Sequence, residues 1–361
     1  MIADVFRDAL AGTSRRLLFT SALPALVFSA VLLGVTLEAA AEASSAAELG
    51  AGPGTGLGTG LGTGLGTAVA TWSDRPASVR TVHAAGFVLA VTLLTALLAA
   101  HRVTLLRWAE GYWPGRFGRR LGARRARRHE RARAQLRGHV RAGGPDAYET
   151  LYLHYPLPGV PVLPTRLGNV LRGAEDYPRT RYGIDAVLVW PRLFPLLPAP
   201  FTGTFASSRA RLDGALAATA LSVAFAVAAP VCTVAVGGAP WLAAVSLVVG
   251  ALGALTGYRA ALTTAVVHGQ QIRVAFDLYR GLLLDTARNG GRPPLPEAGP
   301  ADQWQQQPPA PLPVPAPAPE PVPVPDVLSS AAEREIWEGL CGFWYRNIPV
   351  EARVTAPRSG G

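Results

Sequence analysis

Cysteine, methionine and charge are scarce in this chain of 361 residues, and lysine is missing altogether. Two cysteines exclude a disulfide framework and the usual four-ligand zinc sites. Charged residues make up only 16% of the sequence and hydrophobic residues 49%, which is atypical of a soluble globular protein. The apolar residues lie in uninterrupted blocks that are long enough to cross a bilayer. The sequence therefore predicts a membrane protein.

Motifs that carry familiar enzyme chemistry are missing as well. No two of the six His stand at metal-ligand spacing within one element, and the sequence holds no HExxH, Gly-Lys-Ser phosphate loop, GxSxG or paired CxxC. The sequence thus predicts no catalytic residue, no metal ligand and no cofactor. It favours a non-enzymatic role over an enzymatic one.

Four apolar blocks are predicted to be transmembrane helices, because each approaches the ~20 residues that a hydrocarbon core of ~30 Å requires. They cover residues 17–37, 82–106, 213–237 and 241–258. Only Gly238, Ala239 and Pro240 separate the last two blocks, which predicts a tight helical hairpin. No block has a charge at its centre, where transport proteins usually place one.

The distribution of Arg predicts the orientation in the membrane. Three Arg lie in the N-terminal segment 1–16 and 20 lie between His101 and Leu212, whereas loop 38–81 has two Arg against four acidic residues. The positive-inside rule therefore places both termini and the segment between the second and third spans in the cytoplasm of a plasma-membrane protein. A cleaved signal peptide is the alternative for the first block, but its apolar run exceeds the ~7–15 residues typical of such peptides.

The predicted extracytoplasmic loop, residues 38–81, contains a four-residue repeat. The stretch from Gly54 to Thr67 is GTGLGTGLGTGLGT, with glycine at every second position. A segment of this composition holds no core, so we expect it to be a flexible, solvent-facing linker.

Residues 107–142 are predicted to run along the cytoplasmic membrane surface. Trp108, Tyr112 and Trp113 are typical of the headgroup level, and a helix is expected from about Arg119 to Val140. An Arg cluster beside an anionic leaflet is attracted by ~1 kcal/mol for each nearby basic residue. The predicted contacts with anionic lipid are Arg116, Arg119, Arg120, Arg124, Arg125, Arg127, Arg128 and Arg131.

Two other ligands are alternatives for this Arg cluster. A basic surface also attracts acidic proteins, so a docking face for such a partner is one alternative. Nucleic acid is the other, and it is not favoured, because the Arg run lacks the interleaved aromatic residues of a single-strand binding platform.

Residues 143–212 are predicted to form a small cytoplasmic insert that is mostly helical or α+β. Leu151 to Tyr155 alternate well enough for a short strand, and Thr165 can cap a helix. The apolar run 184–190 is too short for periodicity to separate strand from helix. The insert also holds a mixed-sign cluster, which fits either a surface ion-pair network or an anion or lipid-headgroup site. Its members are Arg166, Arg172, Glu175, Asp176, Arg179, Arg181 and Asp185.

The C-terminal third begins with the fourth span, in which Gly250, Gly253 and Gly257 are predicted to pack closely against another helix. A cytoplasmic stem helix is expected over residues 259–288. A proline-rich and largely disordered linker, rich in polyproline II, is expected over residues 289–327.

Residues 328–347 predict a short amphipathic helix, with a capping box formed by Ser330 and Glu333. An apolar face of this kind at the end of a proline spacer needs a groove, either on the chain's own cytoplasmic part or on a partner protein. The face consists of Ile336, Trp337, Leu340, Phe343 and Trp344.

Several segments carry a resemblance to a known family. They are Leu163-Pro-Thr-Arg-Leu-Gly-Asn-Val-Leu-Arg172, Glu175-Asp-Tyr-Pro, Arg181-Tyr-Gly-Ile-Asp-Ala-Val-Leu-Val-Trp-Pro-Arg-Leu193, Phe276-Asp-Leu-Tyr-Arg280 and Glu333-Arg-Glu-Ile-Trp337. Together they resemble a family of actinobacterial multi-pass membrane proteins. That family has no assigned activity, so the resemblance implies the architecture and carries over no functional residue.

The sequence as a whole predicts an all-α membrane protein with four transmembrane helices, a small cytoplasmic insert and a disordered tail. The leading hypothesis is a non-enzymatic scaffold or interaction protein whose partners are the anionic cytoplasmic leaflet and a protein that meets the last helix. A small channel or transport subunit acting as an oligomer is the alternative. A lipid-modifying enzyme that uses Glu175, Asp176 or Asp185 is the third hypothesis.

Overall fold

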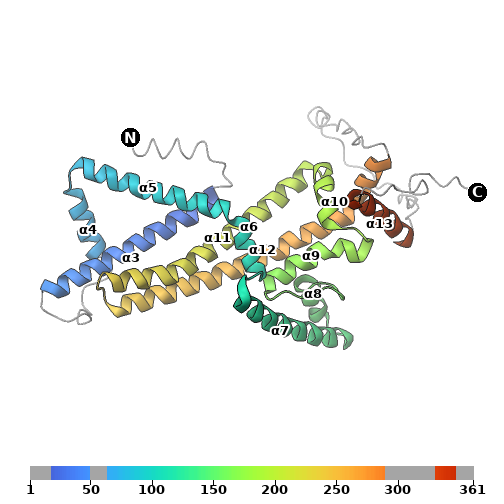
Figure 1. Cartoon of the computed structure of the whole chain (residues 1–361), viewed down its shortest axis with the longest axis horizontal. Helices are drawn as coiled ribbons and strands as arrows, with labels where there is room; N and C mark the ends of the chain where they lie inside the picture. The colour runs from blue at the N-terminus through green and yellow to red at the C-terminus, as the bar shows by residue number, and fades with distance from the viewer. Residues whose placement is uncertain (1–17, 49–62, 289–329, 347–361) are drawn as a thin grey trace, which may run out of the picture. The chain divides into compact units, whose positions relative to one another are not determined.

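The computed structural model describes residues 18–48, 63–288 and 330–346, and this part of the chain consists of helices without a β-strand (Figure 1). Four of the helices are long and apolar enough to cross a membrane: Thr20–Ser44, Ala77–Ala100, Ala199–Ala235 and Pro240–Thr286. The all-α prediction is thereby confirmed for the described residues. The predicted N-terminal segment 1–16 and the proline-rich linker 289–327 lie outside them.

The chain divides into two compact units. Unit 1 comprises Met1–Pro156, Pro161–Gly173 and Gly203–Gly269, and unit 2 comprises Leu157–Val160, Ala174–Thr202 and Gln270–Gly361. Residues of three helices fall in both units, namely α9 (Arg166–Tyr182), α11 (Ala199–Ala235) and α12 (Pro240–Arg288).

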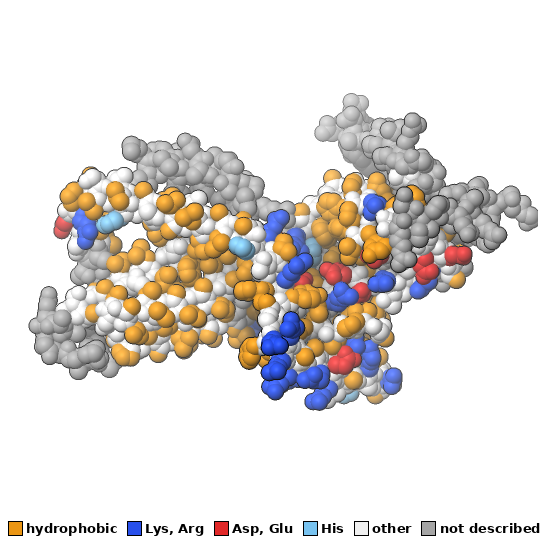
Figure 2. Space-filling model, viewed as in Figure 1, with side chains coloured by type: hydrophobic (Ala, Val, Ile, Leu, Met, Phe, Trp, Pro, Cys, Tyr) orange, Lys and Arg blue, Asp and Glu red, His pale blue; other side chains and the backbone are white. Residues whose placement is uncertain are grey.

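The apolar helices of unit 1 are η1 (Leu18–Ala22), α3 (Leu23–Glu48), α5 (Ala77–Ala100) and parts of α11 and α12. A small core of Ala25, Leu98, Ala217 and Leu221 holds α3, α5 and α11 together. Many large apolar side chains of these helices point outward instead, and Figure 2 shows hydrophobic side chains spread over their visible face. An apolar exterior of this kind suits helices that lipid surrounds.

Glycines bring α11 and α12 into close contact within unit 1. A Cβ added at Gly250 would lie 2.6 Å from the Cα of Ala226, and one added at Gly257 would lie 2.7 Å from Thr219 Oγ1. At Gly253 it would lie 2.9 Å from Ser222 Oγ. The three glycines of the small-residue pattern therefore lie where a side chain would collide with α11, with its backbone at Gly250 and Gly257 and with the Ser222 side chain at Gly253. The turn between the two helices uses Gly237 at a φ of 76°.

Several helix boundaries in unit 1 differ from the prediction, and α11 also extends before residue 213. Helix α3 runs on to Glu48, because the Ala-rich stretch after residue 37 has high helix propensity although it is less apolar. Helix α5 ends at Ala100, and α6 (Arg102–Glu110) follows a break at His101, so the apolar run up to residue 106 is not one helix. Part of the glycine repeat is helical in α4 (Thr63–Ser73), which contacts α3, so the expected loop 38–81 is wrong there.

The strand predicted at Leu151–Tyr155 is wrong. Residues up to His154 belong to α8 (Pro145–His154), which contacts α7 (Gly115–Arg141). Pro145 occupies the first turn of α8 and Asp146 lies near its N-terminus, two features that favour a helix start. Tertiary contact with α7 and these local signals outweigh the short alternating pattern.

Unit 2 has a core of large side chains. It is built by α10 (Ala186–Leu193), η2 (Phe194–Leu196), the stem of α12 and α13 (Ser330–Arg346), and Ile184, Leu193, Phe276 and Trp337 are fully buried in it. The undetermined run 184–190 is largely helical. Asp185 caps this helix, since its Oδ1 accepts hydrogen bonds from the backbone N–H groups of Val187 (3.0 Å) and Leu188 (3.4 Å).

Candidate functional site

The amphipathic C-terminal helix, α13, packs into the core of unit 2. Trp337 is 0% exposed and Leu340 is 9% exposed, and both join a cluster that includes Phe276 and Leu284 of the α12 stem. Ile336 and Trp344 are partly buried against the same cluster. Phe343 is still 39% exposed, so four of the five predicted docking residues face the core and the fifth lies at its edge.

Polar contacts fix the N-terminal half of α13, before Trp337, to two other segments. The guanidinium of Arg280 donates to Glu333 through Nε at 2.6 Å and through Nη2 at 3.4 Å. The guanidinium of Arg334 donates to the carbonyl oxygens of Thr180 (3.1 Å) and Arg181 (3.2 Å). Glu333, which the sequence assigned to a capping box, thus holds α13 against the stem of α12 through an ion pair whose two side chains are mostly buried.

The partner of Glu333 also belongs to an aromatic network in unit 2. Asp277 accepts hydrogen bonds from the hydroxyls of Tyr177 (3.0 Å) and Tyr182 (2.6 Å), and the Arg280 guanidinium lies 4.1 Å from the centre of the Tyr182 ring. Burial, followed by the hydrogen bond to Asp277, raises the pKa of both tyrosines. Both tyrosines therefore stay protonated and donate to Asp277. The network holds in place the part of unit 2 where Arg280 contacts α13.

Close to that surface, Gly183 is the residue that lets α13 approach. Its φ of 76° is in the left-handed region, and a Cβ added there would lie 2.9 Å from Arg334 Cγ. Position 183 therefore needs glycine for two reasons, the turn after α9 and the contact with α13.

In unit 1, the predicted lipid-contact residues lie on α7. All eight of them, Arg116, Arg119, Arg120, Arg124, Arg125, Arg127, Arg128 and Arg131, are exposed. Figure 2 shows the basic side chains gathered over this helix. Arg133 is different, because it is buried and pairs with Glu130 at 2.7 Å.

A cleft of about 650 Å³ opens beside α7 within unit 1. Three guanidinium groups line it, those of Arg125 and Arg128 from α7 and that of Arg166 from the start of α9. The remaining walls are Trp108, Ala109, Trp113, His129, Ala132, Tyr155, Pro164, Thr165 and Tyr258. No carboxylate is among the lining residues.

The positive potential of this cleft acts on the pKa of His129. Its Nδ1 lies 3.3 Å from the hydroxyl of Tyr155. Burial, and then the charges of Arg166, Arg125 and Arg128, lower the pKa of His129 below its usual value. The sequence grouped Arg166 with the mixed-sign residues that follow it, and no local pattern signals that the fold brings it beside α7.

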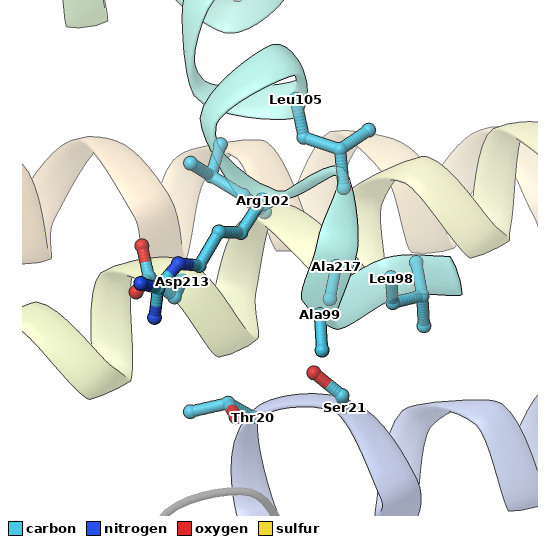
Figure 3. A pocket seen from close by; sticks show the side chains of 9 residues that line it. Thr20, Ser21, Leu98, Ala99, Arg102, Leu105, Asp213 and Ala217 are labelled. Atoms are coloured by element: carbon cyan, nitrogen blue, oxygen red, sulfur yellow. The ribbon is translucent and has the colours of Figure 1, made fainter. Parts of the chain in front are cut away.

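A second, smaller cavity lies near the ends of the apolar helices of unit 1. It has a volume of about 180 Å³ and is lined by Thr20, Ser21, Leu98, Ala99, Arg102, Leu105, Asp213, Leu216 and Ala217 (Figure 3). Asp213 pairs with Arg209 one turn earlier on α11, at 3.2 Å. The cavity is below the ~300–1,000 Å³ of most ligand sites, and we assign it a structural role.

Of the three acidic residues in the lipid-modifying-enzyme hypothesis, Asp185 has a structural contact. Asp185 caps α10 with its carboxylate. Both cysteines are free, and burial raises the pKa of Cys341, which makes its thiol less reactive. Among the described residues no group of three or more potential metal ligands occurs.

Comparison with known proteins gives no further guide to the site. No family model matches the chain, and neither a curated protein nor a solved structure matches it. The resemblance to actinobacterial multi-pass membrane proteins accordingly stays a prediction.

Proposed function

We propose that this chain is a multi-pass protein of the plasma membrane that acts as a non-enzymatic interaction protein, with unit 2 as a module that docks an amphipathic helix. The observation that carries the proposal is the seat of α13, its packing site in the unit 2 core, where Trp337 is fully buried and the nearby Glu333 and Arg334 make polar contacts. A buried Trp with a charged rim is typical of hot spots in helix-in-groove recognition.

The membrane part of the proposal is supported by the four apolar helices and by the distribution of Arg. Both termini and α7 are then cytoplasmic, and α4 is extracytoplasmic. Single-cysteine variants labelled in intact cells with a membrane-impermeant maleimide test this. We expect labelling at Ser73→Cys in α4 and none at Arg131→Cys in α7, and the reverse pattern would overturn the orientation.

The docking part is tested with a labelled peptide of residues 330–346 and two forms of the protein, the full chain and a chain that ends at Arg292. We expect the peptide to bind the shortened chain, whose seat is vacant, and to bind the full chain far more weakly. Replacing Trp337 by Ala in the peptide should weaken binding on the order of 100-fold or more, because burial of this side chain supplies most of the contact.

A peptide with Tyr345→Ala is the matched control, since Tyr345 is 71% exposed. It should bind the shortened chain like the parent peptide. Equal binding of the peptide to both forms of the protein, or of the Trp337→Ala peptide and its parent, would count against a specific seat.

The interaction role itself is tested by cross-linked co-purification from native membranes. We expect partners to change between the full chain, the chain ending at Arg292 and the Trp337→Ala variant, because each alters the occupancy of the seat. The same partners in all three would move the interaction surface away from unit 2.

A further inference from the structure

We propose that the cleft of unit 1 between α6, α7, α9 and α12 binds one anionic glycerophospholipid, with the phosphate held by Arg125, Arg128 and Arg166. This inference rests on the membrane insertion proposed above. It differs from diffuse attraction of the leaflet to α7, because it names one site with defined residues from two distant parts of the sequence.

The first argument is the charge of the cleft. Its walls include three guanidinium groups and no carboxylate. The ion pairs Arg133–Glu130, Arg209–Asp213 and Arg280–Glu333 involve none of these three arginines. The three positive charges repel one another, because no carboxylate lines the cleft. A bound anion would reduce this repulsion and stabilise the arrangement.

The second argument is the chemistry of the walls. Guanidinium groups bind phosphate oxygens in a two-pronged fashion, and several of them around one pocket select phosphate over smaller anions. The Tyr155 hydroxyl and the ring of His129 add hydrogen-bonding groups at the same wall. Trp113 lies under Arg125, whose guanidinium is 5.5 Å from the indole centre, and so restrains its position.

The third argument is size. A volume of about 650 Å³ is within the range of sites for small organic ligands and far exceeds what a single phosphate needs. A phosphodiester with its glycerol backbone and a polar headgroup fits such a volume better than inorganic phosphate does.

The fourth argument is depth. Tyr258 is the last residue of the predicted fourth span, and Trp108 follows soon after the end of α5. Both line the cleft, and Trp and Tyr are the residues that favour the headgroup level of a bilayer. A lipid whose acyl chains stay in the membrane reaches a site at this depth most directly.

The test uses the full chain in nanodiscs that contain phosphatidylcholine with a minor share of phosphatidylglycerol. After mild delipidation, native mass spectrometry counts the lipids that each chain retains. We expect one phosphatidylglycerol per wild-type chain, and an occupancy about tenfold lower for Arg166→Gln and for Arg128→Gln, since each loses a charged hydrogen-bonding group. Arg166→Lys should retain an intermediate amount, because lysine keeps the charge and loses the fork.

Arg131→Gln is the matched control, because Arg131 is an exposed arginine of α7 that belongs to the predicted diffuse contacts with the leaflet and does not line the cleft. It should retain lipid like the wild type. Equal loss in Arg131→Gln and Arg166→Gln would show that attraction is diffuse and would overturn the site. A melting temperature unchanged in Arg166→Gln separates loss of the ligand from loss of the fold.

A competition arm separates lipid from soluble phosphate. Inorganic phosphate and glycerol 3-phosphate, added at millimolar concentration, should leave the retained lipid in place, and displacement of the lipid by either would overturn the assignment to a membrane ligand.

The Trp337→Ala variant should retain lipid like the wild type. A failure of α13 docking is thus distinguishable from a failure of the lipid site, and a protein that does not enter nanodiscs at all would contradict the membrane insertion instead.

Discussion

The two units differ in the large apolar side chains that they leave exposed. In unit 1 small side chains such as Ala217 and Ala261 are buried beside leucines such as Leu212, and many large side chains, among them Leu93 and Val231, point outward. In unit 2 the large side chains Trp337 and Phe276 are fully buried. Lipid solvates apolar side chains and water does not, so the contrast indicates that helix α12, which contributes to both units, is suited to two different solvents along its length.

The largest effect is expected from removing the core of unit 2 at its centre. Trp337→Ala deletes the largest fully buried side chain and should weaken the docking of α13 by about 3–5 kcal/mol. Hydrogen exchange of the full chain in nanodiscs measures this as faster exchange throughout α13. Tyr345→Ala, at an exposed position, is the control, and similar exchange in both variants would contradict a buried seat.

A smaller effect is expected from enlarging Gly250 in unit 1, because α12 packs closely against α11 at this small residue. Gly250→Val places new atoms against the backbone of Ala226 and should cost up to about 3 kcal/mol. Thermal unfolding in a mild detergent gives the comparison. Gly86→Val in α5 is the control, because nothing lies within 4 Å of a Cβ at that position. If both variants melt alike, the close contact of α11 with α12 is not needed for stability.

The ion pair at the edge of the unit 2 core should matter less than the tryptophan at its centre. Glu333→Gln removes the charge that meets Arg280 and should weaken α13 docking by about 1.5 kcal/mol, since both side chains are mostly shielded from water. Proteolysis of α13 at low protease concentration is the readout. Glu335→Gln, an exposed acid on the same helix, should be cleaved at the wild-type rate, and equal sensitivity of the two variants would remove the ion pair from the docking contacts.

The smallest effect concerns pH and the basic cleft of unit 1. Because the pKa of His129 is lowered in the folded chain, the unfolded chain binds more protons below about pH 6.5. Stability should therefore fall as the pH is lowered from 6.5 toward the folded pKa. The melting temperature of wild type and His129→Gln, compared between pH 7.5 and 5.5, should differ in slope, with the variant less sensitive. Equal slopes would mean that folding does not lower the pKa of His129.

Much of unit 1 was predictable because hydropathy is a local property of the sequence. The four apolar helices, the α11–α12 hairpin and the Arg-rich helix α7 all follow from runs of one residue type. The break at His101 and the helical part of the glycine repeat did not, because both depend on contacts of α4, α5 and α6 with neighbouring helices. Periodicity also misled at Leu151–Tyr155, where a few alternating residues belong to a helix.

The candidate sites show the same division. The apolar face of α13 was visible in the sequence as a helical pattern, but its seat was not, because Phe276 and Leu284 come from a different helix. The partner of Glu333 was missed for the same reason, since Arg280 lies on that helix. The cleft was also missed, because Arg166 meets Arg125 only through tertiary structure. Residues of known chemistry were thus predictable one by one, whereas their grouping required the fold.

The docked α13 has a thermodynamic consequence for any competitor. Helix α13 is joined to the α12 stem through residues 289–329 of the same chain. The binding of α13 to its seat therefore depends on an effective concentration, which the tether sets, and not on the concentration of a free ligand. For tethered elements this concentration reaches the millimolar range and falls as the tether lengthens. A free helix with the affinity of α13 would have to approach that concentration to occupy half of the seats. Covalent attachment thereby sets a threshold that only an abundant or a tighter-binding helix can cross.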